Sequence, residues 1–110
     1  MFVTSINNLN NLLVDLEKAG KADMGFHNYR DKANKPVEVM ITHVYGEAEF
    51  TALKMHALEA MSFAQTDGVT AELVFNYTAT DSSFSISFYD YDPLFYEETV
   101  KYICTIKYLY

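Results

Sequence analysis

The sequence predicts a single α+β domain in which helices pack against a four-stranded, mostly antiparallel sheet. Three observations support this. Two segments repeat apolar residues every three or four positions, which is the spacing of amphipathic helices. Three segments alternate apolar and polar residues, as strands do. The length of 110 residues fits one domain, residues 1–110, and a hydrophobic share of 50% is enough to form a core.

The first half is predicted to form a helix followed by a hairpin. A helix over residues 5–20 is indicated by its leucine stripe, and Thr4 or Ser5 can cap its start. Gly20 suits a left-handed helix end. A short strand over residues 24–30 follows, and a polar turn separates it from an alternating strand over residues 37–45.

The second half is predicted to begin in the same way. A helix over residues 47–65 has acidic residues in its first turn and one apolar face. Strands over residues 70–78 and 84–88 then alternate, and the serines of the second strand indicate a lightly covered sheet face. These two strands are expected to form a second hairpin.

The last predicted element is a helix. Asp92 followed by Pro93 is typical of a helix start, so a helix is expected over residues 93–103. The predicted order of elements is therefore α-β-β-α-β-β-α. Residues 104–110 are rich in β-branched and aromatic types, and they fit either the end of this helix or a further strand.

The whole chain has a net charge of −7, and its negative charge is concentrated in the second half. Residues 55–100 contain no Lys or Arg but include eight acids, namely Glu59, Asp67, Glu72, Asp81, Asp90, Asp92, Glu97 and Glu98. Direct binding of nucleic acid is not expected, because it relies on Lys and Arg. The charge favours a protein partner with a basic surface, and it also suits the solubility of a cytosolic domain.

The location expected from the sequence is the cytoplasm. The apolar runs are too short to cross a membrane, and the first residues lack the basic and apolar regions of a secretory signal. Cys104 is the only cysteine, which excludes a disulfide within the chain and a thiolate-rich metal site. Because it lies in an apolar string, Cys104 is expected to be a small buried side chain.

No motif indicates an enzyme, a metal site or a cofactor site. The three histidines, His27, His43 and His56, lack metal-ligand spacing, and His56 with Glu59 is typical of a surface pair. Phosphate-binding loops and nucleophile elbows are absent from the sequence. We therefore expect no catalytic residues and no cofactor, and the function must come from a binding surface.

The candidate binding surface lies in the stretch FYDYDPLFYEETVKY, residues 88–102. It combines tyrosines, which are enriched at the centres of protein interfaces, with carboxylates, and its only base is Lys101. This mixture favours a protein-binding face over a catalytic pocket. The expected partner-binding residues are Tyr89, Asp90, Tyr91, Asp92, Tyr96, Glu97 and Glu98.

The last third of the chain resembles the YezG-like immunity proteins of polymorphic toxin systems. The segment SFSISFYDYD, residues 83–92, looks like their alternating strand that leads into an acidic, tyrosine-containing turn. The segment IKYLY, residues 106–110, looks like their aromatic tail. The resemblance implies a cytoplasmic antitoxin that binds and neutralises a toxin domain. In this family the toxin is often a nuclease, which is basic near its cleft.

Other readings of an acidic α+β domain stay open at this point. The chain could be a phage-encoded inhibitor of a host defence system, of the anti-CRISPR or anti-restriction type. It could also be a small acidic secretion chaperone, which would show an exposed apolar groove and a stable homodimer. The sequence is compatible with a monomer or a homodimer.

Overall fold

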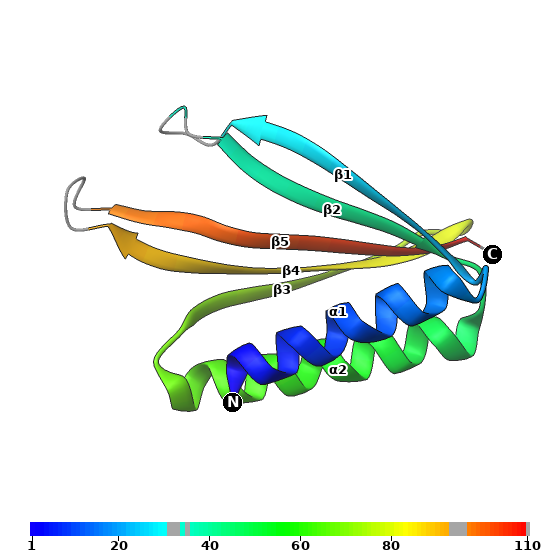
Figure 1. The fold of residues 1–110 in the computed structure, drawn as a ribbon, viewed down its shortest axis with the longest axis horizontal. Helices are drawn as coiled ribbons and strands as arrows, with labels where there is room; N and C mark the ends of the chain where they lie inside the picture. Colours follow the sequence, from blue (N-terminus) through cyan, green and yellow to red (C-terminus); the bar gives the residue numbers. More distant parts are fainter. Residues whose placement is uncertain (31–33, 35, 93–96, 110) are drawn as a thin grey trace.

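The computed structural model describes residues 1–30, 34, 36–92 and 97–109, which form two helices and five strands. Figure 1 shows the two helices side by side beneath one face of a single sheet. The elements are, in chain order, α1 (Phe2–Lys18), β1 (Ala22–Arg30), β2 (Pro36–Val44), α2 (Glu47–Asp67), β3 (Thr70–Tyr77), β4 (Asp81–Asp92) and β5 (Glu97–Leu109).

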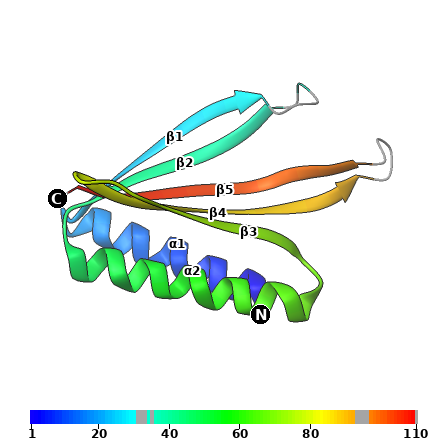
Figure 2. The same cartoon turned by 180° about the vertical axis from the view of Figure 1, so that it is seen from behind.

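The sheet is mixed, with the strand order β1-β2-β5-β4-β3. The pairs β1–β2, β3–β4 and β4–β5 are antiparallel, whereas β2 and β5 run parallel. The last strand therefore fills the centre of the sheet and joins the two hairpins. Figure 2 shows from behind that both helices cover the same face, so the fold has two layers.

The core lies between the sheet and the two helices. Alternate residues of β4 and β5 point toward the helices, and Phe84, Ile86, Cys104 and Ile106 are fully buried there. The ring of Phe50 in α2 lies with its centroid 5.4 Å from that of Phe84. The expected burial of Cys104 is confirmed.

The two helices are tied together where α1 begins and α2 ends. Asp67, at the end of α2, accepts a hydrogen bond of 2.7 Å from the backbone N–H of Phe2, and its Oδ2 lies 3.2 Å from the Met1 ammonium. No acidic residue occupies the first turn of α1, so Asp67 supplies the negative charge that a helix start favours.

The general class and six of the predicted elements are confirmed. Helices and strands were expected over 5–20, 24–30, 37–45, 47–65, 70–78 and 84–88, and the corresponding elements differ mainly in length. Gly20 has the left-handed conformation expected of it, with φ of 73°. The predicted cap at Thr4 or Ser5 is wrong, because α1 begins at Phe2 and Ser5 is a buried helical residue.

The prediction is wrong about the strand number, the element order and the last element. The sheet has five strands and is mixed, and the order is α-β-β-α-β-β-β. Residues 97–103, expected in a helix that starts at Pro93, belong to β5, and residues 104–109 continue the same strand. Asp92 ends β4 and does not cap a helix, and residues 93–96 lie outside the described part. Tertiary pairing with β2 and β4 decides this segment and overrides its local helix signal.

Candidate functional site

The residues singled out from the sequence lie on the hairpin that β4 and β5 form. In the register of this hairpin, Asp90 is opposite Thr99, Tyr91 is opposite Glu98, and Asp92 is opposite Glu97. We call residues 90–92 and 97–102 the acidic arm. The strand pairing thus brings six of the seven predicted partner-binding residues together at one end of the sheet, with Tyr89 opposite Val100 at the base of the arm. The seventh, Tyr96, lies outside the described residues.

The acidic arm extends beyond its neighbouring strands. The ladder between β3 and β4 ends where Thr70 faces Tyr89, and the ladder between β2 and β5 begins only where Val39 faces Ile103. Within the described chain, the two strands of the arm therefore pair only with each other. Figure 1 shows this hairpin and the β1–β2 hairpin diverging toward their tips.

An irregularity in the ladder marks the base of the arm. Phe88 is opposite Tyr102, but Tyr89 is opposite Val100, so Lys101 is an extra residue on β5. Such a bulge bends a strand and increases its twist, and bulges are common where a strand leaves its sheet. Tyr89 is half-buried here, and Ser87 Oγ lies 3.5 Å from its hydroxyl.

The arm carries like charges at directly paired positions. Asp92 and Glu97 are opposite one another; Glu98 follows Glu97 on β5, and Asp90 lies two residues before Asp92 on β4. Like charges in opposed positions destabilise a strand pair, and a two-stranded ribbon is marginal in water by itself. A cationic surface that covers the ribbon would reduce the repulsion between the carboxylates and would add contacts that an isolated ribbon lacks. The arm therefore suits contact with a basic partner.

The three histidines lie on three different elements. His27 and His43 lie on β1 and β2, whereas His56 lies on α2 with its Nδ1 4.0 Å from Glu59 Oε2. In the residues that the structure describes, no three His, Cys, Asp or Glu side chains gather as metal ligands would. Neither described helix combines the length and apolar character needed to cross a bilayer.

Two polar contacts lie near the start of α2, outside the acidic arm. Glu49 lies over Gly46, and its Oε1 is 3.4 Å from Lys21 Nζ; the pKa of Glu49 is lowered, chiefly by a hydrogen bond to backbone and also by Lys21. Asp23 accepts a hydrogen bond from the Tyr45 hydroxyl, which raises the pKa of that phenol. The first contact joins the residue before β1 to α2, and the second joins β1 to the residue that follows β2.

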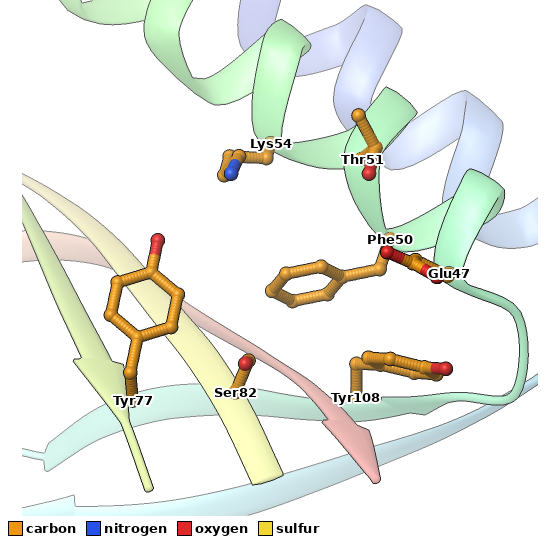
Figure 3. Close-up of a pocket in the computed structure, with 7 residues that line it drawn as sticks. All are labelled: Glu47, Phe50, Thr51, Lys54, Tyr77, Ser82 and Tyr108. Carbon is orange, nitrogen blue, oxygen red and sulfur yellow. The ribbon is translucent and has the colours of Figure 1, made fainter. Parts of the chain in front are cut away.

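A second site, which sequence reasoning missed, is a hollow of about 170 Å³ at the opposite end of β4 and β5 from the arm. Figure 3 shows it between the first half of α2 and the ends of three strands. Its lining comes from α2, β3, β4 and β5, and consists of Glu47, Phe50, Thr51, Lys54, Tyr77, Ser82 and Tyr108. No spacing in the sequence relates these positions, because the tertiary fold alone brings them together.

The hollow has an aromatic centre and polar ends. The ring of Phe50 lies in its middle, with its centroid 5.8 Å from that of Tyr108. The Lys54 ammonium and the Tyr77 hydroxyl lie at one end, and Glu47 lies at the other end near Tyr108 (Figure 3). Neither Lys54 nor Tyr77 has a hydrogen bond or an ion pair to another described residue.

The face of the sheet away from the helices carries a row of serines on β4, beside apolar residues such as Val74 of β3. Ser83, Ser85 and Ser87 of β4 lie on it, as the alternating pattern predicts, and all three are half-buried. Ser85 Oγ and Thr105 Oγ1 form a hydrogen bond of 2.8 Å across β4 and β5. The serine row offers hydroxyl groups but no charged group, so it is a weaker candidate than the arm or the hollow.

Comparisons with known proteins add no relative to this picture. The chain matches no protein-family model, no curated protein sequence and no solved structure.

Proposed function

We propose that this chain is an immunity protein that binds and neutralises a toxin domain through its acidic arm. The observation that carries the proposal is the register of β4 and β5, which gathers Asp90, Asp92, Glu97 and Glu98 on a hairpin that has no other strand beside it. An isolated two-stranded ribbon of this kind is only marginally stable in water.

The charge of the arm indicates what kind of partner would bind it. The chain carries −7 overall, and residues 55–100 hold no Lys or Arg. A nuclease toxin must hold phosphates and is therefore basic near its cleft. An acidic hairpin entering or covering that cleft would block the substrate, and complementary charge would speed the encounter. The tyrosines of the arm would supply contact area and hydrogen bonds.

The resemblance to the YezG-like immunity proteins supports the same proposal. It rests on the β4 strand and its acidic turn, residues 83–92, and on the aromatic tail at residues 106–110. The proposed activity needs neither a cofactor nor a catalytic residue of this chain, and the proposed site of action is the cytoplasm.

The proposal can be tested by identifying the partner and then measuring inhibition. The chain is used to capture its partner from its own source, and the purified partner is assayed for nuclease activity with and without the chain. We expect a basic nuclease domain that loses activity at equimolar chain. Capture of a defence complex, or of an unfolded effector segment, would instead favour the anti-defence or the chaperone reading.

Charge reversal then tests the arm itself. Asp90→Lys combined with Glu97→Lys should weaken inhibition at least tenfold and slow association at low salt, because charge complementarity governs the encounter. Asp15→Lys combined with Glu59→Lys is the matched control, since it changes the net charge equally on exposed helix positions. If both double variants inhibit alike, the acidic arm is not the interface.

A further inference from the structure

The hollow beside α2 has the features of a small ligand site, and it is separate from the proposed toxin-binding arm. Tyr77, Ser82 and Tyr108 lie at the ends of β3 to β5 that are farthest from the arm along the strands. A ligand there would therefore not compete with the partner for the same residues.

The volume of the hollow matches about one ring. Its volume is about 170 Å³. An apolar cavity of about 150 Å³ accommodates benzene, whereas the pockets of drug-sized ligands and cofactors begin at about 300 Å³. A single six-membered ring with one substituent therefore fits within the hollow.

The polar groups of the hollow determine the charge of that substituent. Lys54 and Tyr77 offer an ammonium and a hydroxyl at one end, and neither of these two groups has a hydrogen bond or an ion pair with another described residue. An ammonium and a phenol can both donate to a carboxylate, and charge-assisted hydrogen bonds of this kind are the strong ones. Glu47 at the other end disfavours a second negative group.

We propose that this hollow binds a small aromatic carboxylate. The ring lies against Phe50, and the carboxylate accepts hydrogen bonds from Lys54 Nζ and the Tyr77 hydroxyl. Because Tyr77 is 60% exposed, the site is open to solvent, and we expect binding of low affinity.

Benzoate is the probe that tests this proposal, with benzyl alcohol and benzylamine as its neutral and cationic counterparts. Amide shifts of the intact chain are followed by NMR during each titration. We expect saturable shifts at Tyr77, Ser82 and Tyr108 with benzoate, and binding about tenfold weaker with benzyl alcohol, since a hydrogen bond to a charged group is lost. Absence of saturable shifts with benzoate, or tighter binding of benzylamine, overturns the proposal.

Two variants test the assignment of the polar ends. Lys54→Met should weaken benzoate binding about tenfold, whereas Lys18→Met removes the same charge from the last turn of α1 and should leave it unchanged. Glu47→Gln should tighten benzoate binding severalfold, because a like charge is removed. Equal affinities of the native chain and the Lys54→Met variant would show that Lys54 does not hold the carboxylate.

Discussion

At the scale of single residues, Thr42 is a polar residue in an apolar place. It is fully buried on the helix-facing side of β2, and its hydroxyl has no hydrogen-bond partner among the described residues. A buried hydroxyl without a partner costs on the order of 1–3 kcal/mol in protein mutants. Thr105 of β5, which lies opposite Ile41, differs because its hydroxyl forms a hydrogen bond with Ser85 Oγ.

Thr42→Val should therefore stabilise the fold. The change keeps the branched shape and removes the unpaired hydroxyl, so we expect the free energy of unfolding to rise by about 1 kcal/mol. This change in the free energy of unfolding is measured by urea denaturation, monitored by circular dichroism. Thr105→Val is the matched control and should lower stability, since it leaves Ser85 without its partner. A loss of stability in Thr42→Val equal to that of the control would show that the Thr42 hydroxyl is satisfied in solution.

At the scale of elements, the contact between the end of α2 and the start of α1 makes stability depend on pH. Asp67 accepts hydrogen bonds from the Phe2 backbone N–H and then from the Met1 ammonium, and these lower the pKa of its carboxyl. A carboxyl whose pKa is lower in the folded state than in the unfolded state stabilises the fold when the pH is above the unfolded-state pKa. This stabilisation is lost as the pH falls through the folded-state pKa.

Asp67→Asn should accordingly lower the stability of the fold at neutral pH, and the loss of stability should be smaller at acid pH. The amide keeps an acceptor for Phe2 but cannot carry the charge. We expect the difference in unfolding free energy between the native chain and the variant to be constant near pH 7 and to shrink below about pH 4, the ordinary range of an Asp carboxyl. Chemical denaturation across this range measures it. A difference that grows toward acid pH would contradict the assigned role of Asp67.

The elements also show which structure can be predicted from local sequence. The helix α2 was predictable, because acidic residues begin it and Gly68 ends it in the left-handed conformation with φ of 69°. The strand β5 was not, because Asp92-Pro93 is a helix signal that acts locally, whereas the parallel partner β2 lies far away in sequence. The tyrosines and β-branched residues of residues 97–109 were the available counter-signal.

At the scale of the whole molecule, the two candidate sites differ in how well they can be predicted from the sequence. The residues of the acidic arm are close in sequence, so composition was enough to single them out, although their placement on a hairpin was not foreseen. The hollow takes residues from four elements, and Lys54, Tyr77 and Tyr108 become neighbours only once the sheet closes on α2. A site whose residues come from several elements leaves no contiguous pattern in the sequence from which it could be predicted.

The net charge of −7 also acts on the molecule as a whole. The screening length is about 30 Å at 0.01 M salt and about 8 Å at 0.15 M. The longest dimension is 43 Å, so acidic residues repel one another over most of the molecule at low salt but only over short distances at moderate salt. The described side-chain ion pairs, such as Lys21 with Glu49, are partly exposed, and surface pairs of this kind contribute about 0–1 kcal/mol each. Relief of repulsion therefore outweighs the weakening of ion pairs.

We expect the urea midpoint of the native chain to rise when NaCl is increased from about 0.01 M to about 0.15 M. The variant that combines Asp90→Lys with Glu97→Lys is the informative comparison, because it reduces the net charge from −7 to −3. Its midpoint should exceed that of the native chain at low salt and rise less with NaCl, since it also removes the opposed pair of Asp92 and Glu97. A native midpoint that falls with NaCl, or an equal response of both chains, would show that local ion pairs and not overall repulsion govern the stability of this fold.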